Sequence, residues 1–314
     1  MFQDEEANPL AFISANAPDF FMDFLKKNGY NILVRKVKSL SEFPEVHRVS
    51  LLLVRSNLKI DRNFIDKAAS LKIICRPGAG LDNIDVTYAQ EKGITVLNSP
   101  GANKDAVAEH ALGMLLSMLH HIPKAFEEVK DGKWRREANR GDELGGKTVG
   151  IIGFGNTGSA FARKLSAMNV AILAYDKYKH NFGNKYVRET RNLTPIFEEA
   201  DVLSLHIPLH KETYRMVNSV FLKKFKKRIL LINTSRGDIV DLKDLVKALE
   251  SNKLRGAALD VLPNEDLASY TQSEQEVVSK LLKNKVIITP HIAGWSVQSE
   301  QNHFECLMKK IKQF

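Results

Sequence analysis

Three residues that can bind anions or move protons follow three apolar runs in the last third of the chain. Arg236 follows RILLINTS, Glu265 follows AALDVLPN, and His291 follows VIITP. The separations of 29 and 26 residues each match the length of about one strand and helix. Because the carboxyl ends of parallel strands face one crevice in a doubly wound sheet, we expect a guanidinium, a carboxylate and an imidazole to converge.

Each of these residues also has an ordinary structural role as an alternative. Arg236 can hold a carboxylate bidentately and polarise a carbonyl, but most arginines form surface ion pairs. His291 can act as a general acid and base, but a lone histidine is more often a satisfied core residue. Glu265 can orient that imidazole, or it can be an exposed loop carboxylate. The shared position after a strand favours the chemical roles.

A glycine-rich turn indicates a dinucleotide site between an apolar run and a helix-like stretch. The sequence GFGNTG fits the G-x-G-x-x-G pattern. Its first glycine permits a tight turn, the second lets backbone amides approach a pyrophosphate, and the third lets helix and strand pack closely. A turn without a ligand is the weaker alternative. The candidate cofactor residues of this turn are Gly153, Gly155, Asn156, Thr157 and Gly158.

An acidic residue at the end of the next apolar run indicates which dinucleotide binds. Asp176 lies 18 residues beyond Gly158, where a carboxylate accepts hydrogen bonds from ribose hydroxyls and repels a 2′-phosphate. The sequence therefore favours NAD over NADP, although Lys177 and Lys179 leave NADP open.

A second glycine-rich turn, CRPGAGLDNIDV, follows an apolar run in the first hundred residues. Its backbone amides can form an anion-binding nest, and Arg55 and Arg76 add positive charge on the same side. The alternative is a structural turn with two solvated arginines. The candidate substrate residues are Arg55, Arg76, Gly78, Ala79, Gly80 and Arg236.

The elements that must position these residues form two α/β segments joined by a helical stretch. Short apolar runs bounded by Gly, Pro and Asn alternate with helical periods, which is typical of parallel sheets. A helical segment at 105–140 separates the two series, and we expect it to form a homodimer interface or an intrachain core. A final helix at 296–314 is expected to pack on the first segment. The expected strands are 10–14, 31–36, 49–55, 72–75, 148–153, 170–176, 201–207, 229–233, 257–262 and 286–289.

Composition predicts a cytoplasmic, two-domain protein. The chain has 314 residues, a formal net charge of +9 and 44% hydrophobic residues. We expect no membrane span, no signal peptide in the acidic N-terminus, and no nucleic-acid partner, because no basic stripe carries interleaved aromatics. Two cysteines in no metal or redox spacing predict reduced thiols and no metal site.

The motifs together resemble the D-isomer-specific 2-hydroxyacid dehydrogenase family. The matching stretches run in the family's order from about residue 50 to 295. They are RPGAGLDNID, NSPGANKDAVAEHA, GKTVGIIGFGNTG, HIPL, LINTSRG, LDVLPNE and TPHIAG.

This resemblance implies an α/β fold of two Rossmann-like parallel-sheet domains, one flavodoxin-like and one doubly wound. A cofactor domain, 102–288, would be inserted into a substrate-binding domain, 1–101 and 289–314. The family match implies that Arg236, Glu265 and His291 are catalytic and that NAD is the cofactor. The cofactor-lining residues expected in addition to the glycine turn and Asp176 are His206, Pro208, Thr213, Thr234, Ser235, Asp260, His291 and Gly294.

Within the family the substrate loops are most similar to those of D-3-phosphoglycerate dehydrogenases, which act in serine biosynthesis. The resemblance implies that Arg55 and Arg76 meet the substrate phosphate, although Pro77 replaces the usual small residue after Arg76. The alternatives are a glyoxylate or hydroxypyruvate reductase, a D-lactate dehydrogenase, and an NAD-sensing protein similar to the family's corepressors. Formate dehydrogenases have Gln in place of Glu265, which counts against formate.

Overall fold

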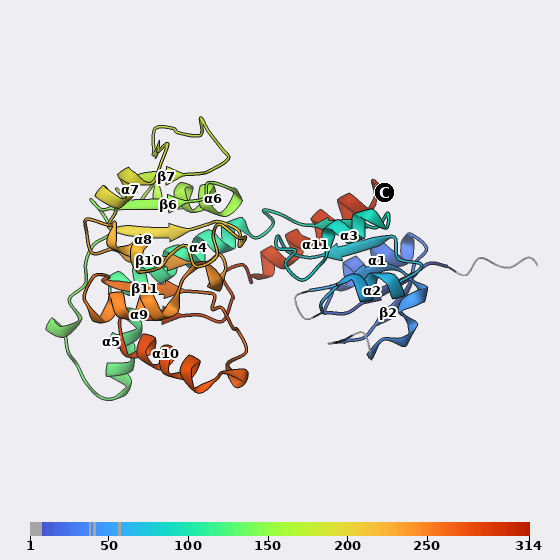
Figure 1. The fold of residues 1–314 in the computed structure, drawn as a ribbon, viewed down its shortest axis with the longest axis horizontal. Coiled ribbons are helices and arrows are strands. Elements are labelled where there is room, and N and C mark those ends of the chain that lie inside the picture. Colours follow the sequence, from blue (N-terminus) through green and yellow to red (C-terminus); the bar gives the residue numbers. More distant parts are fainter. Residues whose placement is uncertain (1–7, 38, 40–41, 56–57) are drawn as a thin grey trace, which may run out of the picture. The chain divides into compact units, whose positions relative to one another are not determined.

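The computed structural model describes residues 8–37, 39, 42–55 and 58–314, and the chain forms two compact units (Figure 1). Unit 1 comprises Met1–Asn103 and Val297–Phe314, and unit 2 comprises Lys104–Ser296. Each unit holds one all-parallel sheet, which confirms the predicted α/β class. Unit 2 extends eight residues beyond the predicted limit of 288, so the loop that carries His291 lies in unit 2.

Unit 1 contains a five-stranded sheet in the order β2-β1-β3-β4-β5. Its strands are β1 (Leu10–Ile13), β2 (Asn31–Val34), β3 (Val49–Leu53), β4 (Ile73–Arg76) and β5 (Thr95–Asn98). Its helices are α1 (Asp19–Lys27), α2 (Arg62–Lys67), α3 (Val86–Glu91) and α11 (Val297–Ile311), with a 3₁₀ turn at Pro44–Arg48.

The alternation of side chains along β3 divides the core of unit 1 in two. Leu51 and Leu53 belong to a cluster with residues of α1 and α11, whereas Leu52 packs in a second cluster with residues of α2 and α3. Successive residues of a strand point to opposite faces, and here both faces are buried. This explains why residues 51–54, LLLV, are all apolar instead of alternating with polar residues.

Unit 2 contains a seven-stranded sheet in the order β12-β11-β10-β9-β6-β7-β8. Its strands are β6 (Thr148–Ile152), β7 (Ala171–Tyr175), β8 (Val187–Glu189), β9 (Val202–Leu205), β10 (Leu230–Asn233), β11 (Gly256–Leu259) and β12 (Val286–Ile288). Its α-helices are α4 (Lys104–Leu119), α5 (Ile122–Lys130), α6 (Asn156–Leu165), α7 (Thr194–Glu199), α8 (Ser219–Lys223), α9 (Leu242–Glu250) and α10 (Gln272–Lys283).

Two hydrophobic clusters cover the two faces of the unit 2 sheet. Residues of α4 and α6 pack in one cluster, and residues of α7, α8, α9 and α10 pack in the other. The sheet is therefore doubly wound, and its loops at the carboxyl ends of the strands are left to form a site.

The structure differs from the prediction at several elements. The strands β5 and β8 and the helices α3 and α7 were not predicted, because each is three to six residues long and shows little periodicity. The segment predicted as helical at 105–140 is not helical throughout. Its second helix, α5, ends at Lys130, because Gly132 adopts a φ of 72° that breaks the helical path.

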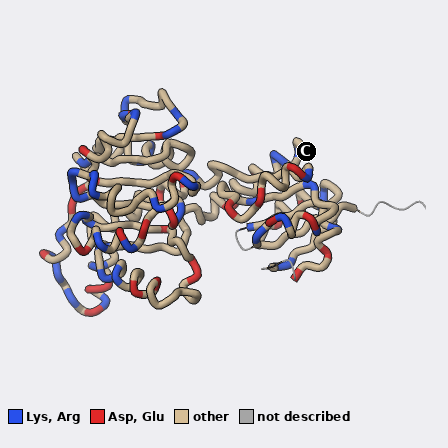
Figure 2. The backbone as a smooth tube through the Cα atoms, in the orientation of Figure 1, with Lys and Arg blue, Asp and Glu red and all other residues tan. Residues whose placement is uncertain are grey.

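In the described residues, side chains of both charges are mixed over the surface (Figure 2) and the cysteines are free thiols. Basic and acidic residues lie interspersed over each unit (Figure 2). Both cysteines are free, and burial raises the pKa of Cys75, which keeps it a thiol. No helix among residues the structure describes is both long and apolar enough to cross a membrane.

A buried histidine joins α11 to the glycine turn of unit 1. His303 is 6% exposed, and its Nδ1 lies 2.7 Å from Ser99 Oγ, which also accepts a hydrogen bond from the Gly78 N–H at 2.9 Å. Burial, and then the cations of Arg55 and Arg76, lower the pKa of His303 to about 4. The neutral ring therefore accepts the Ser99 O–H and fixes the turn.

This histidine makes the stability of unit 1 dependent on pH. Its folded pKa lies below the ordinary value, so between about pH 4 and 6.5 the unfolded chain binds more protons and stability falls as pH drops. We expect the wild type to lose up to roughly 2 kcal/mol through this group between pH 7 and 5. His303→Asn cannot be protonated, so the gap in melting temperature between it and the wild type should narrow at pH 5. An unchanged gap would show that His303 is not buried as a neutral base.

Candidate active site

The three predicted catalytic residues follow three neighbouring strands of unit 2. Arg236 lies after β10, Glu265 after β11 and His291 after β12, and β10, β11 and β12 are adjacent and parallel. The strands thus bring the predicted residues to one edge of the sheet.

His291 and Glu265 form a direct pair. The Nδ1 atom of His291 lies 2.9 Å from the Glu265 carboxylate, with both oxygens within reach. Each side chain is 47% exposed. Because Nδ1 faces the carboxylate, Nε2 is the ring atom that remains for a reacting molecule.

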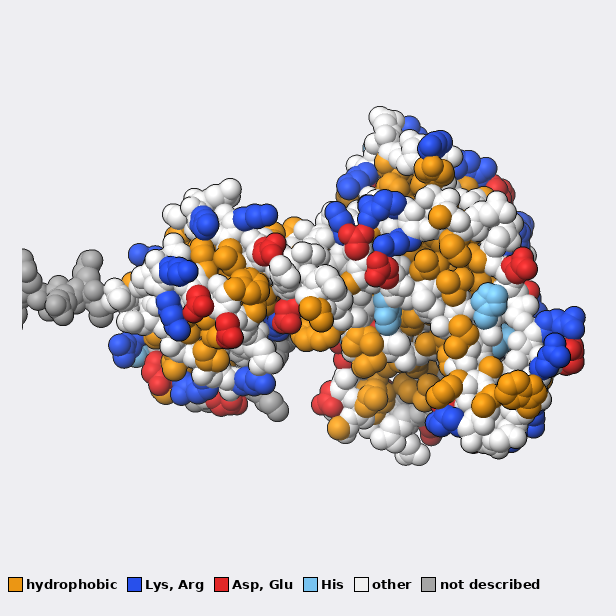
Figure 3. Space-filling model, turned by 180° about the vertical axis from the view of Figure 1, so that it is seen from behind, with side chains coloured by type: hydrophobic (Ala, Val, Ile, Leu, Met, Phe, Trp, Pro, Cys, Tyr) orange, Lys and Arg blue, Asp and Glu red, His pale blue; other side chains and the backbone are white. Residues whose placement is uncertain are grey.

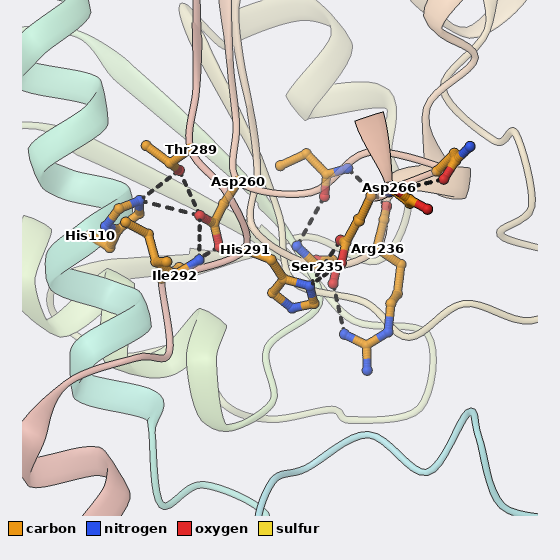
Figure 4. A network of polar contacts seen from close by, with 12 residues as sticks. His110, Ser235, Arg236, Asp260, Asp266, Thr289, His291 and Ile292 are labelled. Carbon is orange, nitrogen blue, oxygen red and sulfur yellow. Dashed lines mark hydrogen bonds and ion pairs between the residues drawn. The ribbon is translucent and has the colours of Figure 1, made fainter. Parts of the chain in front are cut away.

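Arg236 extends from the adjacent loop on the same side as the imidazole (Figure 4). Its Nη1 donates to the Ser235 carbonyl at 2.8 Å, and its own carbonyl accepts from Asn233 Nδ2 at 2.9 Å. These two bonds fix the start of the turn, so the guanidinium projects beyond the strand end. A cation beside a carboxylate-paired imidazole is suited to binding a small carboxylic acid.

The backbone of His291 is held in an unusual conformation. Its φ is 55°, in the left-handed region that residues other than glycine seldom adopt. Its N–H donates to the Asp260 carbonyl at 2.8 Å. Such strain persists only where surrounding contacts enforce it, and it is concentrated at functional sites.

The carboxylate of Asp260 enforces this conformation. Asp260 is 1% exposed, and it accepts hydrogen bonds from Thr289 Oγ1 at 2.6 Å, the Ile292 N–H at 2.9 Å and the Ala293 N–H at 2.8 Å. The predicted cofactor residue Asp260 therefore directs its carboxylate into the loop on either side of His291 (Figure 4).

His110 completes this network and was not predicted. Its Nε2 lies 3.0 Å from Thr289 Oγ1 and 3.5 Å from Asp260 Oδ1. Since the Thr289 hydroxyl donates to Asp260, its oxygen accepts from Nε2–H, which defines the tautomer. The only sequence signal for this role was a polar residue at the edge of the apolar face of α4.

The glycine turn is shaped to admit a ligand at one position and not at the others. A Cβ on Gly153 would lie 2.2 Å from the His206 carbonyl oxygen. A Cβ on Gly158 would lie 2.0 Å from the Gly153 carbonyl oxygen. A Cβ on Gly155 would meet nothing within 4 Å. Asn156 and Thr157 begin α6, and the first N–H groups of a helix have no partner within the helix.

Asp176 is held as an anion at the end of β7. Burial alone would raise its pKa, but the N–H groups of Lys179, Tyr178 and Phe154 and the charge of Lys179 lower the pKa below its ordinary value. The N–H bonds measure 2.7 Å from Phe154 and 2.9 Å from the other two. An ionised carboxylate at this point suits ribose hydroxyls better than a phosphate.

Two predicted cofactor residues carry buried polar atoms that the described residues leave without a hydrogen bond. These atoms are Nδ1 of His206 and Oγ1 of Thr234. Buried polar atoms are normally satisfied, so both fit a polar ligand. Together with the open space at Gly155, they fit the expected dinucleotide.

The remaining predicted cofactor residues have internal contacts. Thr213 Oγ1 donates to the Pro208 carbonyl at 2.8 Å, and Ser235 Oγ donates to the Leu205 carbonyl at 2.6 Å. The Thr213 hydroxyl thus holds its own loop, and the Ser235 hydroxyl joins the segment after β10 to the end of β9. Gly294 follows directly after the loop that Asp260 binds.

Apart from Arg236, the predicted substrate residues lie in unit 1. Gly78 has a φ of 153°, and a Cβ there would lie 2.0 Å from Arg76 Nη1. The Ala79 carbonyl accepts from Asn98 Nδ2 at 2.9 Å. Within the described part of the chain, no hydrogen bond uses the N–H of Ala79 or Gly80, as an anion-binding turn requires. Arg55 lies two residues after the end of β3, and its Nη2 is ion-paired with Glu300 Oε1 at 2.7 Å.

Two glycine substitutions should separate folding from cofactor binding. Gly155→Ala places a methyl group in open space, so we expect wild-type stability and at least tenfold weaker NAD binding. Gly158→Ala forces a methyl against the Gly153 carbonyl and should destabilise unit 2 by about 1–3 kcal/mol. Thermal melts and NAD titration by fluorescence measure both. Equal NAD affinity in Gly155→Ala and wild type would remove the turn from the cofactor site.

Replacing the buried carboxylate should destabilise the loop of His291. Asp260→Asn turns an acceptor of two backbone N–H groups into a group with its own N–H, and should cost about 2–3 kcal/mol in urea unfolding. Asp131→Asn, at an exposed helix end, is the control and should change stability by less than about 0.5 kcal/mol. Similar stability in the two variants would contradict the role given to Asp260.

Comparison with known proteins agrees with this geometry. Residues 112–293 match the family model of the NAD-binding domain of D-isomer-specific 2-hydroxyacid dehydrogenases. A hydroxypyruvate reductase of Thermotoga maritima is 39% identical over 85% of each chain. A D-3-phosphoglycerate dehydrogenase of Archaeoglobus fulgidus is 36% identical over 90% of this chain, which spans about half (52%) of that relative.

Solved structures share the fold along nearly the whole chain. A D-lactate dehydrogenase from Aquifex aeolicus, complexed with NAD and lactic acid, is 30% identical, with a TM-score of 0.85 over 97% of this chain and 95% of its own. The chain belongs to the family of D-isomer-specific 2-hydroxyacid dehydrogenases, and unit 2 contains its NAD-binding domain.

Proposed function

We propose that the chain interconverts a D-2-hydroxy acid and its 2-oxo acid with NAD, using Arg236, Glu265 and His291. The observation that carries this proposal is the His291–Glu265 pair, set next to Arg236 after three adjacent strands of an NAD-binding domain. NAD, when bound, supplies the nicotinamide that accepts or donates the hydride. The residues proposed to hold it are the glycine turn, Asp176, His206 and Thr234.

The three side chains divide the remaining work. His291 Nε2 takes the hydroxyl proton during oxidation and returns it during reduction. Glu265 holds Nδ1 and stabilises the positive charge that the ring acquires. Arg236 binds the substrate carboxylate and the oxygen that becomes the carbonyl. The backbone N–H groups of Ala79 and Gly80 are proposed to bind the substrate through unit 1.

The substrate has two candidates. Arg55 and Arg76 support 3-phosphoglycerate, since arginines bind phosphate well, and relatives include a phosphoglycerate dehydrogenase. Hydroxypyruvate or glyoxylate is supported by the pairing of Arg55 with Glu300 and by the hydroxypyruvate reductase relative. The alternative to an enzyme is an NAD-sensing binding protein, which would bind NAD without turning over any acid.

We also propose a cytoplasmic homodimer formed through residues 105–140. Unit 2 has large apolar side chains exposed on and after α5, as expected for a surface that another subunit covers. Hydrophobic side chains also gather on the face of unit 2 in Figure 3. The exposed side chains are Ile122, Phe126, Val129 and Trp134.

Turnover of a panel of 2-oxo acids tests the proposed function. NADH consumption should be seen with at least one of glyoxylate, hydroxypyruvate, 3-phosphohydroxypyruvate and pyruvate. Glu265→Gln keeps a hydrogen-bond acceptor but removes the charge, so kcat should fall about 10²-fold while NADH affinity is retained. Glu250→Gln, at the exposed end of α9, is the matched control and should leave kcat unchanged. Binding of NADH without turnover of any acid would favour the binding-protein reading.

A further inference from the structure

The guanidinium of Arg55 is engaged by a carboxylate of the same unit. Its Nη2 lies 2.7 Å from Glu300 Oε1, and its side chain is only 16% exposed. Its Cζ lies 5.8 Å from the centre of the Phe304 ring. The Asn83 side chain donates to the Arg55 carbonyl at 2.8 Å, which fixes the backbone just after β3. Arg55 is therefore held in place by contacts with its guanidinium and with its backbone.

Glu300 is well placed to keep its negative charge at this position. It lies in the first turn of α11, where the helix dipole stabilises an anion. Its side chain is 47% exposed, so the carboxylate stays hydrated on one side while it meets the buried cation on the other. A pair with one partner shielded from water is stronger than an exposed pair.

The buried ring next to these residues adds no positive charge. His303 is neutral near pH 7, because its pKa is about 4, and it lies on the same helix as Glu300. A phosphate dianion that approached Arg55 would therefore meet the Glu300 carboxylate without a compensating imidazolium. It would have to displace Glu300 or lie beside a like charge, and either one weakens binding.

We propose that Glu300 makes this chain prefer 2-oxo acids that carry no phosphate. Glu300 does so by pairing with Arg55, the arginine that would otherwise bind a substrate phosphate. Glu300 is a positioning and specificity residue, since it acts through Arg55. This inference rests on the proposed function. Among the candidate substrates it selects hydroxypyruvate and glyoxylate, small acids that carry no charged group besides the carboxylate. It also explains how a phosphoglycerate-like arginine can occur in a chain with a different substrate.

Glu300→Gln tests this selection directly. Glutamine retains an acceptor for Arg55 and removes only the charge. The ratio of kcat/KM for 3-phosphohydroxypyruvate to that for hydroxypyruvate should rise about tenfold, through KM for the phosphorylated acid. Glu305→Gln is the control, because it removes the same charge from the same helix. The Glu305 carboxylate accepts a hydrogen bond from Gln301 Nε2 at 2.8 Å, and the substitution should leave the ratio unchanged.

A binding measurement separates failure of this inference from failure of the proposed function. Calorimetry with D-3-phosphoglycerate and D-glycerate needs no turnover, and Glu300→Gln should bind the phosphorylated acid about tenfold more tightly relative to glycerate. Unchanged ratios in both assays, with melting curves like the wild type, would overturn the role of Glu300 while leaving the dehydrogenase intact. A wild type that prefers the phosphorylated acid would overturn it as well.

Discussion

The buried carboxylate of Asp260 is the interaction on which the active site depends. A charge that is 1% exposed is costly unless hydrogen bonds replace water. Here two backbone N–H groups and the Thr289 hydroxyl replace it, and all three belong to the loop that carries His291. The loop is therefore fixed by the need to satisfy one anion. As a result, His291 is held at a positive φ with its ring against Glu265.

The same logic extends to the other side chains of the site. Arg236 is oriented within its own turn, because its Nη1 donates to the Ser235 carbonyl and its own carbonyl accepts from Asn233 Nδ2. Arg55 is oriented by a carboxylate, which uses part of its charge within unit 1. The two arginines are chemically identical, yet one donates to a backbone carbonyl and the other pairs with a carboxylate. Charge counted from the sequence could not reveal this difference.

The parts of the structure that follow from local patterns were predictable. The long apolar strands, the glycine turn and the order of Arg236, Glu265 and His291 can be read from residue types and spacing, because strand burial and turn sterics are local. The contacts of His110 and Glu300 are not local. His110 reaches Thr289 across 179 positions and Arg55 reaches Glu300 across 245. The short strand β8 and the end of α5 at Lys130 depend on packing and on one glycine.

The most direct test of the account follows the hydride itself. We propose that unit 2 carries an acid–base pair and an anion-binding arginine that serve hydride transfer at C2 of a D-2-hydroxy acid. Incubation of the protein with hydroxypyruvate and NADH deuterated at C4, followed by mass spectrometry and chiral separation, reports where the label goes. The account predicts deuterium at C2 of D-glycerate, and none in a His291→Ala variant that still binds NADH. Label lost to solvent, label in L-glycerate, or equal transfer by the variant would contradict it.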